Sequence, residues 1–161
     1  MLSRLAWLAL GLACLSSVAL ADPYSYCVVY ASRACFGVAP GDQVVVSAPA
    51  DFVVYDVTLS SGAQGRIYSG MHANIRGAPF EERAEACIDE DRDCAFLVRT
   101  GNQVRGYYTY GGAEVEITFS QIEPQHMGEV KAFLKSFRRC VRGGGGVACT
   151  NESVFDVDRD L

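Results

Sequence analysis

The sequence predicts an α+β fold: an antiparallel sheet of about five or six strands, with a C-terminal amphipathic helix packed on one face and disulfide bonds stapling the fold. Three observations lead to this prediction. Apolar and polar residues alternate between short glycine-bearing turns over residues 44–69 and 95–119. Apolar residues recur at three- and four-residue steps over 124–141. Of the seven cysteines, all but Cys14 fall into close pairs.

The clearest element is a three-stranded meander. Strands are expected over residues 95–100, 103–110 and 113–119, joined by Gly101-Asn102 and Gly111-Gly112. Two-residue loops of this kind favour hairpins, because glycine adopts the positive φ that primed turns need. In the last strand every second residue is apolar, so one face of the meander is expected to enter the core.

A second hairpin is expected before the meander. Residues 44–46, 52–59 and 66–69 are rich in β-branched and aromatic side chains, and 52–59 alternates with the period of a half-buried strand. Residues 60–65 are small and polar and include glycine, which predicts a longer hairpin loop between the last two strands.

Two helices complete the expected fold. The first spans 78–89, with Pro79 at its first position and one apolar face formed by Phe80, Ala84, Cys87 and Ile88. The second runs from about 124 to 140, and its stripe consists of Met127, Val130, Leu134, Phe137 and Val141. The glycines at 143–146 end it, and residues 147–161 are expected to form a flexible acidic tail.

The N-terminal segment has the features of a cleavable signal peptide spanning residues 1–21. Arg4 precedes an apolar stretch over 5–15, and Ala19-Leu20-Ala21 provides a small-residue cleavage site. Residues 22–161 are then a single exported domain, expected in the periplasm or outside the cell. Cys14 stands in a stretch that loosely resembles a lipobox, but the apolar run continues past it, so soluble export without stable membrane insertion is expected.

The cysteine pairs are Cys27/Cys35, Cys87/Cys94 and Cys140/Cys149. In an exported protein such pairs indicate structural disulfides, and sequential pairing is the simplest of the connectivities that six cysteines allow. The spacing is not that of a zinc site, so neither a metal nor another cofactor is expected. Alternating aspartates at 89–93 and 156–160 lack the glycine and glutamate of an EF-hand loop; they are expected to be solvated, with weak calcium binding as the alternative.

Charge and composition narrow the classes of function. The formal net charge is −5, and no basic run has the density of a nucleic-acid site. A hydrolase using His72 with Asp56 and either Ser60 or Ser61 is one alternative, but no G-x-S-x-G motif accompanies these residues. We therefore expect no enzymatic activity and no nucleic-acid partner.

Two surfaces are candidates for protein recognition. One is the hairpin loop, through Ser60, Ser61, Gly62 and Gln64. The other is the polar face of the 103–110 strand, where Arg105 and Tyr107 are residue types enriched at binding hot spots. An ordinary solvent-facing sheet surface is the alternative for this second pair.

The resulting hypothesis is a non-enzymatic exported binding protein. Its most concrete form is an inhibitor or immunity-type protein that neutralises an extracytoplasmic enzyme such as a cell-wall hydrolase, whose basic surface an acidic protein would complement. The small hydrolase and a structural or assembly factor of the cell envelope are the alternatives.

Overall fold

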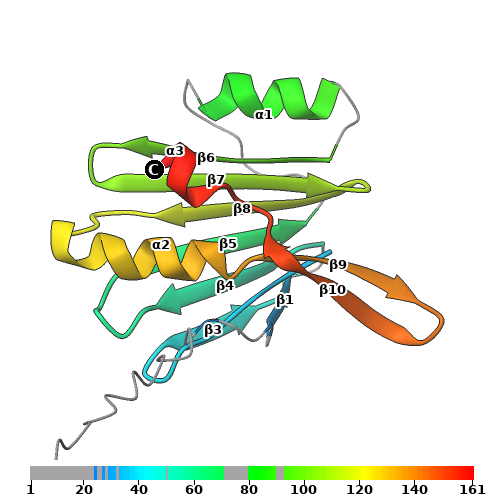
Figure 1. Cartoon of the computed structure of the whole chain (residues 1–161), viewed down its shortest axis with the longest axis horizontal. Helices are drawn as coiled ribbons and strands as arrows, with labels where there is room; N and C mark the ends of the chain where they lie inside the picture. The colour runs from blue at the N-terminus through cyan, green and yellow to red at the C-terminus, as the bar shows by residue number, and fades with distance from the viewer. Residues whose placement is uncertain are drawn as a thin grey trace, which may run out of the picture.

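The computed structural model describes residues 24, 27, 29–31, 33–49, 51–70, 80–89 and 93–161. The expected signal peptide, Cys14, His72, Pro79 and Asp91 lie outside these described residues. Figure 1 shows two sheets, with helices packed around the larger one.

The larger sheet contains both the predicted meander and the predicted hairpin that precedes it. Its strand order is β3-β4-β5-β8-β7-β6, and every neighbouring pair is antiparallel. The strands are β3 (Gln43–Ser47), β4 (Val53–Thr58), β5 (Gln64–Gly70), β6 (Cys94–Thr100), β7 (Gln103–Tyr110) and β8 (Ala113–Phe119). Pairing of Ile67 with Ile117 joins the first hairpin to the meander across β5 and β8. The antiparallel, sheet-rich class and both hairpins are therefore confirmed.

A second sheet was not predicted. It has the order β1-β2-β9-β10 and consists of β1 (Val29–Ala31), β2 (Ala34–Phe36), β9 (Arg138–Gly143) and β10 (Gly146–Ser153). The β9–β10 hairpin projects from the body of the protein, as Figure 1 shows in orange. Its turn lies within the glycine run, and Gly143 pairs with Gly146.

The last long helix is shorter than predicted. A 3₁₀ turn, η1 (Pro124–His126), leads into α2 (Met127–Lys135), and the chain then enters β9. Val141, expected on the helix stripe, lies instead on β9 with 49% of its surface exposed. Apolar residues keep helical spacing from Met127 to Val141, which is why a longer helix was predicted. Residues 138–143 instead form hydrogen-bonded strand pairs with both β2 and β10. Tertiary pairing therefore decides the end of the helix.

The expected flexible tail is ordered over most of its length. Residues 146–153 form β10, and α3 (Val157–Asp160) follows. Phe155 and Val157 are buried in the main core, and the Asp160 carboxylate accepts a hydrogen bond from the Leu97 amide of β6 at 3.0 Å. We predicted a flexible tail because the segment is acidic, but the side chains of Phe155 and Val157 anchor it to the core.

The large sheet has an apolar cluster on each face. Tyr107 and Tyr108 are neighbours on β7, so their side chains point to opposite faces. On the Tyr108 side lies the main core, which includes Val130, Phe133 and Leu134 of α2. On the Tyr107 side, α1 (Phe80–Asp89) buries Phe80, Ala84 and Cys87 against Phe96 and Tyr107.

Three disulfide bonds join the cysteines in sequential pairs, as predicted. Their Cα–Cα distances are 5.4 Å for Cys27–Cys35, 5.7 Å for Cys87–Cys94 and 4.0 Å for Cys140–Cys149. The second bond ties α1 to the start of β6, and the third joins directly opposed residues of β9 and β10. Each bond therefore fastens a peripheral element next to the core.

The fold predicts a large effect for Phe133→Ala. Phe133 is fully buried, and its ring centroid lies 5.5 Å from those of Phe36 and Phe119 and 5.6 Å from that of Phe137. Truncating such a side chain removes buried apolar surface and leaves a cavity, at a cost of about 3–5 kcal/mol. Urea unfolding followed by circular dichroism would measure this loss.

Val45→Ala is the control, because Val45 is 64% exposed on β3. We expect it to change the free energy of unfolding by less than about 0.5 kcal/mol. Equal losses of unfolding free energy for the two substitutions would contradict the burial of Phe133 in the core.

Candidate functional site

The hairpin loop predicted as a recognition surface is a compact turn between β4 and β5. The Gly62 amide donates to the Leu59 carbonyl at 2.8 Å, and the Leu59 amide donates to the Ala63 carbonyl at 2.9 Å. Leu59 and Ala63 are buried, whereas Ser60, Gly62 and Gln64 are exposed. Gly62 has a φ of 93°, which favours glycine at this position. We call residues 60–64 the β4–β5 loop; its last residue, Gln64, is also the first of β5.

Two carboxylates hold this loop from outside the hairpin. Asp42 accepts from the Ser60 amide and from the Ala39 amide, both at 2.9 Å, and so connects the loop to the turn before β3. Glu129 on α2 accepts from the Ser61 amide at 3.0 Å and from the Ser60 hydroxyl. The loop is therefore bound both to a neighbouring turn and to a helix of the core.

The negative charge of Glu129 strengthens its hydrogen bonds to the β4–β5 loop. Partial burial raises the pKa of its carboxyl, but the hydrogen bonds from Ser60 and Ser61 outweigh burial and leave the pKa below its ordinary value. Glu129 is consequently ionised at neutral pH, and its hydrogen bonds to the loop are charge-assisted.

The two serines serve the loop itself. The Ser60 hydroxyl donates to Glu129, and the Ser61 hydroxyl accepts from the Ala63 amide at 3.4 Å. Asp56, the carboxylate of the hydrolase alternative, forms an ion pair with Arg66 at 2.7 Å. The loop backbone is thus fixed by hydrogen bonds, and Gly62 and Gln64 are exposed on it.

Arg105 and Tyr107 do not form the exposed surface that was predicted. Tyr107 has no exposed surface, because α1 covers this face of the sheet and packs Phe80 against it, with ring centroids 6.4 Å apart. The Arg105 side chain is 17% exposed; it pairs with Glu116 at 2.6 Å and lies over the Phe80 ring at 3.9 Å. The prediction of a solvent-facing pair is wrong, since alternation along β7 does not reveal that a helix covers this face.

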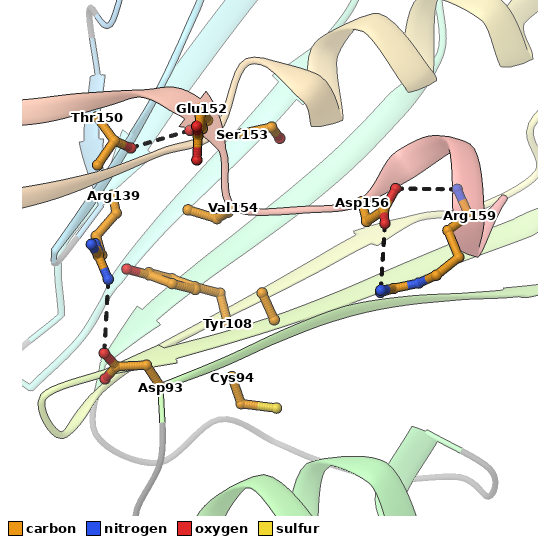
Figure 2. A pocket seen from close by; sticks show the side chains of 11 residues that line it. Asp93, Cys94, Tyr108, Arg139, Thr150, Glu152, Ser153, Val154, Asp156 and Arg159 are labelled. Atoms are coloured by element: carbon orange, nitrogen blue, oxygen red, sulfur yellow. Dashed lines mark hydrogen bonds and ion pairs between the residues drawn. The ribbon is translucent and has the colours of Figure 1, made fainter.

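A cleft of about 420 Å³ lies where the two sheets and α3 meet. Figure 2 shows Arg139 of β9 reaching toward Asp93, the residue before β6, with the Tyr108 ring beside them. The Arg139–Asp93 distance is 3.9 Å, and Arg159 pairs with Asp156 at 3.4 Å on the other side of the cleft. Thr150, Glu152 and Ser153 of β10 complete its polar lining.

Two hydrogen-bond donors lie at the cleft, one buried and one exposed. The Tyr108 hydroxyl is buried and has no hydrogen-bond partner among the described residues. Burial raises its pKa, so it stays protonated and can donate. Arg139 also lies over the Tyr110 ring, 5.1 Å from its centroid. The exposed Arg139 can bind an acceptor that enters the cleft, whereas the Tyr108 hydroxyl is covered by protein atoms. None of the described residues lining the cleft is a histidine.

Sequence reasoning did not find this cleft. Residues up to 140, Arg139 among them, were expected to be helical, and no motif connects Arg139 or Tyr108 to Asp93 or Glu152. Pairing of β2 with β9, which places Arg139 opposite Ala34, brings these distant segments to the edge of the large sheet.

Among the described residues, one group of side chains could hold a metal ion. The Sγ atoms of Cys27, Cys35, Cys140 and Cys149 all lie within 4.8 Å of one another, although the four residues are joined here as two disulfides. Sequence spacing alone does not predict this cluster, because its two halves lie more than a hundred residues apart.

Comparison with known proteins gives no relatives. No protein-family model matches the chain, and neither curated proteins nor solved structures give a significant match. None of the helices in the described part of the chain has the length and apolar character that a bilayer crossing requires.

The Arg105–Glu116 pair predicts a structural role for Arg105. Both side chains are largely buried, at 17% and 12% exposure, so Arg105→Ala leaves the Glu116 carboxylate without its cation under α1. We expect a loss of about 3 kcal/mol, the lower end of the cost of breaking a buried ion pair. A double-mutant cycle with Glu116→Gln, measured by urea unfolding, should show coupling between the two sites.

Arg66→Ala is the matched control, because the Arg66–Asp56 pair lies on the same sheet with side-chain exposures of 68% and 47%. We expect it to cost less than about 1 kcal/mol. A larger loss for Arg66→Ala than for Arg105→Ala would refute this assignment.

Glu129 predicts a pH-dependent contribution to stability. Its pKa is lower in the folded chain than in the unfolded one, so its contribution is present at neutral pH and disappears as the pH falls through the lowered value. Glu129→Ala should therefore reduce the free energy of unfolding by about 1–2 kcal/mol at pH 7. The difference from wild type should narrow below about pH 4, near and below the ordinary pKa of a glutamate.

Unfolding curves at several pH values would test this, with Glu85→Ala on the exposed side of α1 as the control. That control should differ little from wild type at any pH. A Glu129→Ala effect that stays constant from neutral to acid pH would show that the ionised carboxylate does not hold the loop.

Proposed function

We propose that this protein is a non-enzymatic, exported binding protein that neutralises an extracytoplasmic enzyme, such as a cell-wall hydrolase, through the β4–β5 loop. The observation that carries the proposal is the double attachment of this loop by Asp42 and Glu129. A loop already held in one conformation loses little conformational entropy on binding, and more of its contact energy then appears as affinity.

The scaffold supports this role. Glu129 stands on α2, and the neighbouring Val130, Phe133 and Leu134 are fully buried, so the carboxylate has a rigid base. Three disulfides further restrict the chain and are typical of proteins in oxidising compartments. An inhibitor that acts outside the cytoplasm needs this resistance to unfolding.

Charge supports a basic partner. The net charge is −5, and both groups that hold the loop are carboxylates. Attraction between an acidic inhibitor and a basic enzyme raises the association rate and falls with added salt. Many of the remaining surface charges are paired internally, as in Arg66–Asp56 and Lys135–Asp158.

The test is inhibition of purified basic cell-wall hydrolases, both glycosidases and amidases, measured as release of soluble fragments from peptidoglycan. Gln64→Arg places a long cation at the exposed end of the loop without removing a backbone hydrogen bond within it. We expect this variant to weaken inhibition at least about tenfold, or 1.4 kcal/mol, as expected for a residue near a binding hot spot.

Asn151→Arg is the matched control, because it makes the same charge change at an exposed position of β10. It should inhibit like wild type. Failure of the wild-type protein to inhibit any hydrolase, or equal loss in both variants, would reject the loop as the inhibitory surface.

A further inference from the structure

Two of the three disulfides are packed against each other. The four Sγ atoms of Cys27, Cys35, Cys140 and Cys149 all lie within 4.8 Å of one another. Cys35 and Cys140 are buried, and Cys27 and Cys149 are partly exposed. The remaining pair, Cys87–Cys94, lies between α1 and β6 and does not belong to this group.

We infer that these four cysteines form a single sulfur centre which, once both disulfides are reduced, binds one soft divalent metal ion such as Zn²⁺ as a tetrahedral tetrathiolate. Thiolates are the ligands that Zn²⁺ prefers in closed structural sites. The inference concerns a different part of the molecule from the β4–β5 loop and does not depend on the proposed function.

Backbone pairing, rather than the disulfides, brings three of the ligands together. Cys140 and Cys149 are directly opposed on β9 and β10, so they share a face of the sheet. Cys35 on β2 is directly opposed to Arg138, two residues before Cys140 on β9, and therefore lies on that same face. The Cys140 amide also donates to the Arg33 carbonyl at 2.8 Å. The sheet keeps these three sulfurs together when the covalent bonds are opened.

The separations suit a zinc ion after small side-chain movements. Zn–S bonds of about 2.3 Å place the sulfurs of a tetrahedral site roughly 3.8 Å apart. No two sulfurs in the cluster are more than 4.8 Å apart, so the widest pair must approach by about 1 Å at most to reach this spacing. The two sulfurs of each former disulfide must move apart. Rotation about the Cα–Cβ bonds can provide both changes, because a reduced cysteine is free of its partner.

The surroundings favour the charge of such a site. Four thiolates and a divalent cation leave a net charge of two minus, which neighbouring cations stabilise. Arg138 lies on the same face of the sheet as Cys35 and Cys140. Arg139, the next residue, lies on the opposite face and pairs with Asp93. Cationic surroundings also favour the thiolate over the thiol, which is the form that binds metal.

The chemistry balances with a dithiol or a phosphine as reductant. Each disulfide accepts two electrons and two protons and becomes two thiols. A dithiol reductant leaves as its own disulfide, and a phosphine leaves as its oxide after taking the oxygen atom from water, which also supplies the two protons. The metal ion then displaces the thiol protons, which pass to solvent, and forms four metal–sulfur bonds without changing its oxidation state. Two molecules of an oxidising disulfide such as oxidised glutathione accept the four electrons of the thiolates and leave as four thiols, which restores the two bonds and releases the ion.

Cobalt substitution tests the site directly. The purified chain is reduced with a phosphine without oxygen and titrated with Co²⁺. We expect an intense sulfur-to-cobalt charge-transfer band with the visible absorption of tetrahedral cobalt, saturating at one ion per chain and lost when Zn²⁺ is added. The unreduced protein should show no band. A weak octahedral spectrum would overturn the inference.

Matched variants assign the ligands. Cys149→Ser removes a partly exposed ligand and should abolish the tetrahedral spectrum, whereas the double variant Cys87→Ser/Cys94→Ser removes the separate pair and should keep it. The same spectrum in Cys149→Ser, or its loss in the double variant while the fold is retained, would reject this ligand set.

Alkylation of the wild-type chain removes the dependence on variant folding. The reduced protein is treated with iodoacetamide with and without Zn²⁺, and the labelled peptides are measured by mass spectrometry. Zn²⁺ should abolish labelling of Cys27, Cys35, Cys140 and Cys149 while Cys87 and Cys94 react as in the metal-free protein. Equal protection of all six cysteines, or protection of none, would contradict the inference.

Discussion

Burial of an aromatic cluster joins the two sheets, and the positions of the β4–β5 loop and of β9 follow from it. Phe36 of β2 stacks on Phe137 with ring centroids 5.2 Å apart, and it meets Tyr55 of β4 edge-on at 5.6 Å. Phe133 of α2 contacts both phenylalanines. Rings from both sheets and from α2 therefore exclude water together, and burying this apolar area is the main stabilising term available to the fold.

The same cluster positions the two regions that carry our proposals. Because Phe133 fixes α2, Glu129 of that helix faces the β4–β5 loop and accepts its hydrogen bonds. Because Phe137 is fixed against Phe36, β9 starts beside β2, which brings Cys140 close to Cys35 and places Arg139 over the cleft. A single packed centre thus determines a rigid loop at one site and a four-sulfur cluster at another.

Local pattern was enough to predict the elements whose partners are near in sequence. The meander and the β4–β5 hairpin have alternating strands joined by glycine-bearing turns, and both were found with small shifts at their ends. The β9–β10 hairpin was missed because the helical spacing up to Phe137 continues at Val141, while the competing pairing with β2 comes from residues a hundred positions earlier. For the same reason, the sequence did not predict that Asp42 and Glu129 bind the backbone of the loop serines, since both carboxylates are distant in sequence. Tyr107 was predicted on an exposed face and is buried. Alternation of polar and apolar residues along β7 separates the two faces of the strand, but it does not reveal that α1 covers the polar one.

Amide hydrogen exchange of the wild-type protein tests the central claim, that the core holds the β4–β5 loop through α2. We expect the Ser60 and Ser61 amides, bound to Asp42 and Glu129, to exchange as slowly at neutral pH as amides within α2. The exposed Gly144 and Gly145 at the tip of the β9–β10 hairpin provide the fast reference. Exchange of the Ser60 and Ser61 amides as fast as that reference would show that the loop is not held, and would contradict the account.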